Sequence, residues 1–284
     1  RLSAEALYLA QERALKEIDE LLEGAGVENA VVKGAASRLV LYENPAIRAC
    51  FDLDLLVRPE DRVRAASALA DVGFIPQADE RIIGHELLLS QGAVDIDLHW
   101  GLLREGRLQH DLAENMLDRR CRENEIWMLN AEDALFVLLV HSAFSKHLAG
   151  WEMGLHRVVD IVTWLRTQSY DWEVVCARLE QNGVKTAAWA TLRWVDLLTR
   201  PHQLPGLDTM MSALCPGRFR RAWLDRWLRN DNSERTSNAH WARLLGFSLF
   251  LHDTPGDVVR ALAGRRQAHR RSSTDLRAFR ELLD

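Results

Sequence analysis

Two aspartates, Asp52 and Asp54, are separated by one residue within an otherwise apolar stretch of the sequence. Side chains alternate between the two faces of a β-strand, so both carboxylates are expected on one face and the apolar neighbours, Phe51 among them, on the other. Two carboxylates about 4 Å apart repel by about 4 kcal/mol at an effective dielectric of about 20. A proton, a cationic side chain or a divalent metal ion must offset this repulsion, and clustered oxygen ligands favour Mg²⁺ or Mn²⁺.

A second polar group lies on the later stretch Asp95-Ile96-Asp97-Leu98-His99. Alternation places Asp95, Asp97 and His99 on one face of the expected strand. A third carboxylate from a neighbouring strand completes a two-metal site, which holds the attacking and leaving oxygens of an in-line displacement at phosphorus. The sequence favours Asp97 as this ligand and leaves Asp95 as the alternative. His99 is expected either to contact the substrate or to hold a carboxylate in place.

A short β-type run ends at Lys33-Gly34 and leads directly into a helix. In such a turn, backbone N–H groups and the helix N-terminus can face an anion, and Lys33 adds a positive charge. Strand–glycine–helix turns are common, so this turn indicates a phosphate site only in combination with the aspartates.

The elements that must position these residues change in character along the chain. Periodicity and turn residues predict helices over 3–23, 35–42 and 59–69, and strands over 27–33, 50–57, 74–77, 86–90 and 94–100. After about residue 105 strand signals vanish, and helices are predicted over 130–148, 155–165, 171–179, 185–198, 218–229, 239–251, 256–269 and 274–283. We therefore expect an α/β fold, with a small mixed sheet of about four or five strands in residues 1–105 and an all-helical domain in residues 106–284. His85 and Glu86 are expected on the surface of the hairpin that turns at Gln91-Gly92.

Composition and charge narrow the class of protein. The hydrophobic fraction of 48% is typical of a globular protein with a substantial core, and no apolar run reaches the ~20 residues of a membrane span. The net charge of −5 gives no general attraction to nucleic acid. The four cysteines form no zinc motif, so we expect reduced thiols in a cytoplasmic protein. The first helix is acidic and has no apolar segment of the signal-peptide type, so we expect no targeting peptide.

Taken together, these segments resemble a known superfamily. A strand–glycine turn, a helix, a strand with Asp-x-Asp and a later strand with one more acid follow the order of the polymerase-β-like nucleotidyltransferases. More narrowly, the chain is similar to the bacterial nucleotidyltransferase family proteins over most of residues 30–175. The segments that carry this resemblance are Val32-Lys33-Gly34-Ala35-Ala36, Arg48, Asp52-Leu53-Asp54-Leu55-Leu56-Val57 and Asp97-Leu98-His99-Trp100.

The resemblance implies a metal-dependent reaction. A nucleoside monophosphate would pass from a nucleoside triphosphate (NTP), such as ATP, to an acceptor, with release of pyrophosphate. Asp52 and Asp54 would bind both metal ions, Mg²⁺ or Mn²⁺. Asp97 would complete the catalytic metal site and accept the proton of the acceptor.

The same resemblance implies the nucleotide-binding residues. Gly34 would form the phosphate turn, and Lys33 and Arg48 would neutralise the triphosphate. The wider superfamily usually has Gly-Ser at this turn, whereas this sequence has Gly34-Ala35, and Ser37 supplies a hydroxyl nearby. The interval between this turn and the Asp-x-Asp strand is also longer than usual, although the narrower group shares it.

The acceptor is expected to be a small molecule, a peptide or a protein. His99 and His141 are the residues expected to contact it, with a hydrogen-bonded core histidine as the alternative for His141. Two other functions stay open. An RNA-directed enzyme or toxin would need a local basic channel, which the acidic net charge disfavours. A non-catalytic nucleotide- or peptide-binding protein with a degenerate transferase fold would have no use for three clustered carboxylates.

Overall fold

A computed structural model describes residues 3–77, 85–146, 151–199, 204, 206–229 and 246–264. The chain divides into two compact units. The first contains residues 1–105, 111–130 and 263–284, and the second contains residues 106–110 and 131–262. The helix expected over 274–283, and the first part of the one expected over 239–251, lie outside the described residues.

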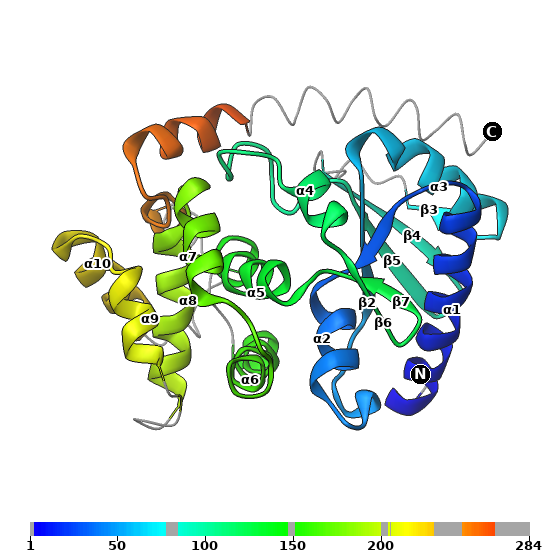
Figure 1. The fold of residues 1–284 in the computed structure, drawn as a ribbon, viewed down its shortest axis with the longest axis horizontal. Helices are drawn as coiled ribbons and strands as arrows, with labels where there is room; N and C mark the ends of the chain where they lie inside the picture. The colour runs from blue at the N-terminus through cyan, green and yellow to red at the C-terminus, as the bar shows by residue number, and fades with distance from the viewer. Residues whose placement is uncertain are drawn as a thin grey trace. The chain divides into compact units, whose positions relative to one another are not determined.

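The first unit is built on one mixed sheet of seven strands in the order β3-β4-β5-β2-β1-β7-β6 (Figure 1). The strands are β1 (Asn29–Val31), β2 (Asp52–Val57), β3 (Ile75–Pro76), β4 (Glu86–Gln91), β5 (Val94–His99), β6 (Cys121–Glu123) and β7 (Ile126–Met128). β2 pairs parallel with β5 and antiparallel with β1, and β4 pairs antiparallel with both β5 and β3. At the other side, β7 pairs parallel with β1 and antiparallel with β6.

Three of the four described helices of this unit match the helices predicted over 3–23, 35–42 and 59–69, whereas the short helix at 113–118 was not predicted. The four are α1 (Ala4–Gly24), α2 (Lys33–Leu41), α3 (Arg62–Asp71) and α4 (Ala113–Asp118), with 3-10 turns η1 (Pro45–Ile47) and η2 (Pro59–Asp61). α1 and α3 pack against one face of the sheet, where they form the apolar core with alternate residues of β2, β4 and β5 (Figure 1). Each fully buried Leu, Ile or Val side chain contributes about 1.5–3 kcal/mol to folding.

The alternation in β2 has the predicted phase. Leu53, Leu55 and Val57 belong to the core cluster, so Asp52 and Asp54 leave the strand on the opposite face. The prediction for Phe51 was wrong. The strand begins at Asp52, and the Phe51 side chain, which precedes it, is 75% exposed.

The sheet is larger than the sequence predicts. β6 and β7 lie after residue 105, where only helices were expected, and they extend the sheet beyond β1. Each has three residues, too few to display the alternation on which strand prediction depends. Asn124 and Glu125 both adopt positive φ angles, 50° and 69°, in the two-residue turn between them. Turns of this kind usually contain Asn-Gly, and the missing glycine removes the usual hairpin signal.

In the described residues of the second unit, the regular secondary-structure elements are all helices. Its helices are α5 (Ala131–Lys146), α6 (Trp151–Thr167), α7 (Trp172–Gln181), α8 (Lys185–Leu198), α9 (Leu207–Ala213) and α10 (Arg218–Arg229), and residues 246–250 and 255–264 are also helical. α5 packs against α6, α7 and α8. Its fully buried Asp133 carboxylate receives a 2.6 Å hydrogen bond from Arg178 of α7. The mixed α/β sheet and the C-terminal helices confirm the predicted fold class.

Among the described helices, none has the length and apolar character needed to cross a membrane. The four cysteines are free thiols, as expected.

Candidate active site

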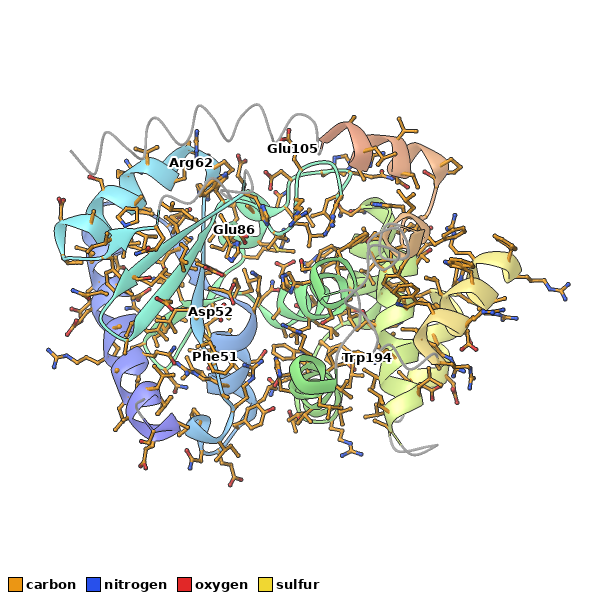
Figure 2. The ribbon with its side chains drawn as sticks, turned by 180° about the vertical axis from the view of Figure 1, so that it is seen from behind. Phe51, Asp52, Arg62, Glu86, Glu105 and Trp194 are labelled. Carbon is orange, nitrogen blue, oxygen red and sulfur yellow. The ribbon has the colours of Figure 1, made fainter. Side chains whose placement is uncertain are left out.

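The parallel pairing of β2 with β5 brings carboxylates from two distant parts of the sequence together. Asp54 lies opposite Asp97, and Asp52 lies opposite Asp95. One ligand atom from each of Asp54, Asp97 and His99 lies within 4.8 Å of the other two. Asp52, labelled in Figure 2, is half-buried at the start of β2. Its carboxylate shares the face of Asp54 but is not part of this close group. The structure therefore brings Asp54, Asp97 and His99 into one cluster, with Asp52 beside it.

Asp95 has a different environment from Asp97. It receives a 2.6 Å hydrogen bond from the Ser90 hydroxyl of β4 and is absent from the close group that contains Asp97. In the described part of the chain, no hydrogen bond or ion pair engages the Asp97 carboxylate. These environments favour Asp97 over Asp95 as the third ligand.

Lys33 supplies a positive charge to the cluster. Its Nζ atom lies 2.7 Å from Asp54 Oδ1 and 2.8 Å from His99 Nε2. Lys33 begins α2 with a φ angle of 53°, a conformation that costs a non-glycine residue about 1–2 kcal/mol. The preceding Val32 N–H donates a 3.0 Å hydrogen bond to the Asp54 carbonyl, which ties this turn to β2. The turn thus places an ammonium group directly on the central carboxylate.

Asp54 and Asp97 face each other but differ in electrostatics. Burial alone would raise the pKa of Asp54, but the charges of Lys33 and His99 and their hydrogen bonds outweigh it and hold that pKa well below its ordinary value. Burial, together with the charge of Asp54, raises the pKa of Asp97 to about 6. The cluster therefore holds more negative charge than Lys33 balances.

The ring of His99 contacts the central carboxylate. Its side chain is 2% exposed, and Nε2 lies 2.8 Å from Asp54 Oδ1. Of the two roles that the sequence analysis left open, the structure displays the contact with a carboxylate. Contact with the substrate stays a prediction.

Gly34, at the start of α2, allows an arginine to approach closely. A Cβ atom at Gly34 would lie 3.0 Å from Arg48 Nη1 and 3.3 Å from Cys50 Sγ. Arg48 is 8% exposed, and its Nη1 donates a 2.7 Å hydrogen bond to the Ala49 carbonyl. The structure thus brings Arg48 to the Gly34 turn, and its contact with a triphosphate stays a prediction. Ser37 is buried within α2, and among the described residues no hydrogen bond connects it to the carboxylates.

His141 lies on α5 of the second unit and is half-buried. Its predicted contact with the acceptor therefore stays a prediction.

The donor set fits a hard divalent cation. Three carboxylates on one face of adjacent strands offer the oxygen ligands that Mg²⁺ and Mn²⁺ prefer. The raised pKa of Asp97 reports buried negative charge that a cation would offset. Asp52, Asp54 and Asp97 are the residues that would hold it, with Lys33 occupying one oxygen of Asp54 in the structure.

His85 and Glu86 adjoin this cluster, and the sequence analysis did not include them in it. They were expected on the hairpin surface, yet their side chains are only 13% and 32% exposed. The length of the hairpin loop could have predicted their position. β4 and β5 are joined by the two-residue turn Gly92-Ala93, and counting residue pairs back from this turn places Glu86 opposite His99.

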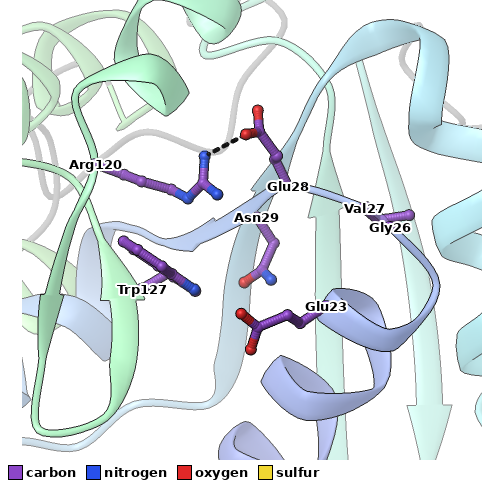
Figure 3. Close-up of a pocket in the computed structure, with 7 residues that line it drawn as sticks. All are labelled: Glu23, Gly26, Val27, Glu28, Asn29, Arg120 and Trp127. Carbon is purple, nitrogen blue, oxygen red and sulfur yellow. Dashed lines mark ion pairs between the residues drawn. The ribbon is translucent and has the colours of Figure 1, made fainter.

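A separate cavity of about 170 Å³ lies elsewhere on the first unit (Figure 3). Arg120 lines the cavity, where its Nη1 lies 3.1 Å from Glu28 Oε1 and its guanidinium lies 4.6 Å from the centre of the Trp127 ring. Its lining contains none of the predicted site residues, so it does not enter the functional argument.

Replacing Asp97 with asparagine is expected to stabilise the metal-free protein. The folded-state pKa of Asp97, about 6, lies above its ordinary value of 3.8, so the folded protein holds this proton more tightly than the unfolded chain does. The resulting gain in the free energy of unfolding is complete below about pH 4 and is lost as the pH rises through 6. At pH 8 the neutral amide should therefore raise the free energy of unfolding by roughly 1–3 kcal/mol. Melting of both proteins with chelator between pH 4.5 and 8 measures this, and the gain should shrink when Mg²⁺ replaces the chelator. A variant that is less stable than wild type at pH 8 would contradict the prediction.

Comparison with known proteins adds one finding. A family model described as an uncharacterised nucleotidyltransferase matches residues 1–200. No curated protein matches the chain.

Proposed function

This chain belongs to the family of uncharacterised nucleotidyltransferases, and we propose that it transfers a nucleoside monophosphate from an NTP to an acceptor, with release of pyrophosphate, in a reaction that depends on Mg²⁺ or Mn²⁺. The observation that carries the proposal is the position of Asp54 opposite Asp97 on adjacent parallel strands, with Asp52 on the same face. Such converging carboxylates suit an in-line displacement at phosphorus.

Each carboxylate has a distinct role in this proposal. Bound divalent ions would neutralise the triphosphate and stabilise the charge that develops during transfer. Asp52 and Asp54 hold these ions, and Asp97 completes the set. The acceptor oxygen forms a bond to the α-phosphorus, the bond from that phosphorus to the pyrophosphate oxygen breaks, and the acceptor proton passes to Asp97.

Lys33 has the role of an exchangeable counter-ion. Its ammonium group offsets the charge of Asp54 in the structure, at 2.7 Å. The flexible four-carbon stem of a lysine allows the same group to turn to a triphosphate oxygen once a divalent ion pairs with Asp54. Arg48, next to the Gly34 turn, supplies a second positive charge to the phosphates.

The acceptor in this proposal is a small molecule, a peptide or a protein. The helices within residues 131–262 would contact the acceptor, with His141 as one contact, in a cytoplasmic protein.

Incubation of the protein with each α-³²P-labelled NTP tests the proposal. The reaction contains Mg²⁺ or Mn²⁺ and, in separate tubes, a metabolite pool, a peptide and protein pool, or total RNA. We expect label in the metabolite or the peptide and protein fraction together with an equal amount of pyrophosphate, and mass spectrometry of the labelled species identifies the acceptor.

Three other results would count against the proposal. Label in the RNA fraction that falls steeply with salt would favour the RNA-directed alternative. A thermal shift with an NTP but no pyrophosphate from any pool would favour a binding protein. Equal labelling in chelator and in Mg²⁺ would remove the metal from the mechanism.

A further inference from the structure

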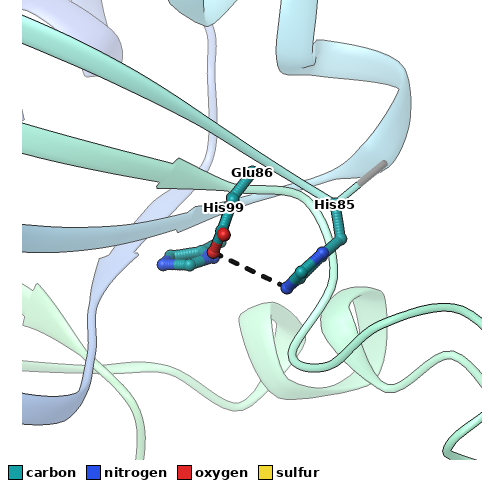
Figure 4. A group of neighbouring side chains, drawn as sticks. All are labelled: His85, Glu86 and His99. Carbon is teal, nitrogen blue, oxygen red and sulfur yellow. Dashed lines mark ion pairs between the residues drawn. The ribbon is translucent and has the colours of Figure 1, made fainter. Parts of the chain in front are cut away.

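A second group of potential metal ligands lies where β4 begins and β5 ends. Figure 4 shows the side chains of His85, Glu86 and His99 converging there, and one ligand atom from each lies within 4.8 Å of the other two. The backbone holds all three in place. Glu86 is the direct cross-strand partner of His99, and the carbonyl of His85 accepts a 3.0 Å hydrogen bond from the N–H of Trp100.

The distances within this group suit a shared ion better than direct hydrogen bonds. Glu86 Oε2 lies 3.4 Å from His99 Nδ1 and 3.6 Å from His85 Nε2. Hydrogen bonds between such atoms are usually about 2.7–3.2 Å long. Ligands that form bonds of about 2.1 Å to a tetrahedral metal ion are about 3.4 Å apart. Glu86 Oε2 thus lies at the spacing of a fellow ligand from each of the two ring nitrogens.

An independent observation concerns the second ring nitrogen of His99. The side chain is 2% exposed, and Nδ1 is buried with no hydrogen-bond partner among the described residues. An unsatisfied buried polar atom costs about 1–3 kcal/mol. This atom is the one that points toward Glu86, so a bound ion would satisfy it.

The chemistry of the three side chains selects a class of ion. Two imidazoles with one carboxylate favour transition-metal ions such as Zn²⁺, whereas Mg²⁺ prefers oxygen ligands. Glu86 supplies the single carboxylate of this set.

We propose that His85, Glu86 and His99 form a site for a divalent transition-metal ion, of which Zn²⁺ is the best fit, distinct from the oxygen site of Asp52, Asp54 and Asp97. His99 connects the two sites, because its Nδ1 faces Glu86 and its Nε2 contacts Asp54. A metal ion bound at Nδ1 would leave the single ring proton of His99 on Nε2, and this N–H would donate a hydrogen bond to Asp54. A protonated Nε2 cannot accept a hydrogen bond from Lys33, so metal binding would favour release of Lys33 from the ring. The inference rests on geometry and does not depend on the proposed function.

Cobalt is the probe for this site, because Co²⁺ takes similar ligands and absorbs visible light. The full chain, without a histidine tag and freed of metal by chelation, is titrated with Co²⁺ in excess Mg²⁺, which occupies the oxygen site. We expect a visible absorption band that saturates at a single equivalent. Loss of an outer-shell partner already costs a metal site 10–100-fold in affinity, so His85→Asn and Glu86→Gln should each weaken binding by at least about tenfold. The matched controls His110→Asn and Glu60→Gln, at exposed positions, should bind as wild type does.

X-ray absorption of the zinc-loaded wild-type protein gives a test that needs no variant. Two imidazole ligands would support the proposed site, whereas the group of Asp54, Asp97 and His99 supplies one. One imidazole or none, or the absence of a cobalt band in wild type, would overturn the inference. A band lost in Asp97→Asn but kept in His85→Asn would also overturn it, because the ion would then sit on the carboxylates. Circular dichroism of each variant confirms folding before titration.

Discussion

Replacing Asp54 with asparagine is expected to reduce nucleotidyl transfer by at least about 10³-fold, which corresponds to about 4 kcal/mol of transition-state stabilisation. Asp54 is 6% exposed, faces Asp97 across the strand pair and carries the ion pair with Lys33. The amide keeps the shape of the side chain but removes the charge that holds a divalent ion. Single-turnover transfer of labelled nucleotide measures the loss, and the double variant Asp52→Asn, Asp54→Asn should leave no detectable product.

Asp95→Asn is the matched control for this prediction. Asp95 lies on β5, shares the face of Asp97 and pairs opposite Asp52, yet its carboxylate accepts a hydrogen bond from Ser90. We expect activity within a few-fold of wild type for this variant, and a loss comparable to that of Asp54→Asn for Asp97→Asn. If Asp54→Asn still transfers nucleotide at the wild-type rate, or if Asp95→Asn is the inactive member of the β5 pair, the assignment of the site is wrong.

The second large effect concerns stability and is expected for Gly106→Ala. Gly106 has a φ angle of 82°, and a Cβ atom there would lie 2.4 Å from the carbonyl oxygen of Arg260 and 3.0 Å from its carbonyl carbon. Backbone atoms cannot rotate away as the end of a side chain can, so the helix at 255–264 must shift. We expect a loss of about 3 kcal/mol or more in the free energy of unfolding of the second unit. Calorimetry should record a melting temperature lower by about 10 °C.

Gly206→Ala separates the clash from the backbone penalty. Gly206 has a nearly equal φ angle of 80°, but none of the described heavy atoms lies within 4 Å of a Cβ atom placed there. This variant should lose only the conformational penalty of about 1–2 kcal/mol. Equal losses in the two variants would show that the close approach of Arg260 does not constrain the fold.

Much of the fold was predictable because its signals are local. The period-two pattern of Leu53, Leu55 and Val57 identified both the strand and the face that carries Asp52 and Asp54. Helix starts and stops depend on nearby residues, such as Asp171, whose side chain caps α7 by accepting hydrogen bonds from Glu173 and Val174. The strands β6 and β7 were missed because each has three residues, too few to show an alternation of apolar and polar side chains.

The site was predictable only in part, since residue types are visible in a sequence and pairings often are not. Alternation on two strands predicted which face of the sheet Asp52, Asp54, Asp97 and His99 occupy. The pairing of Glu86 with His99 was also predictable, because a two-residue hairpin loop determines the register of the two strands that it joins.

By itself, the sequence determined which side chains are available for chemistry and which face of a strand each one occupies, because a strand alternates with a fixed period. Only the tertiary structure decided that β2 lies parallel to β5 in the register that sets Asp54 opposite Asp97. It also decided that Lys33, 21 residues before Asp54, ends on that carboxylate rather than in solvent. Register between strands joined by a long crossover, and the direction of a side chain at a strained turn, depend on how the whole core packs, so no local pattern records them.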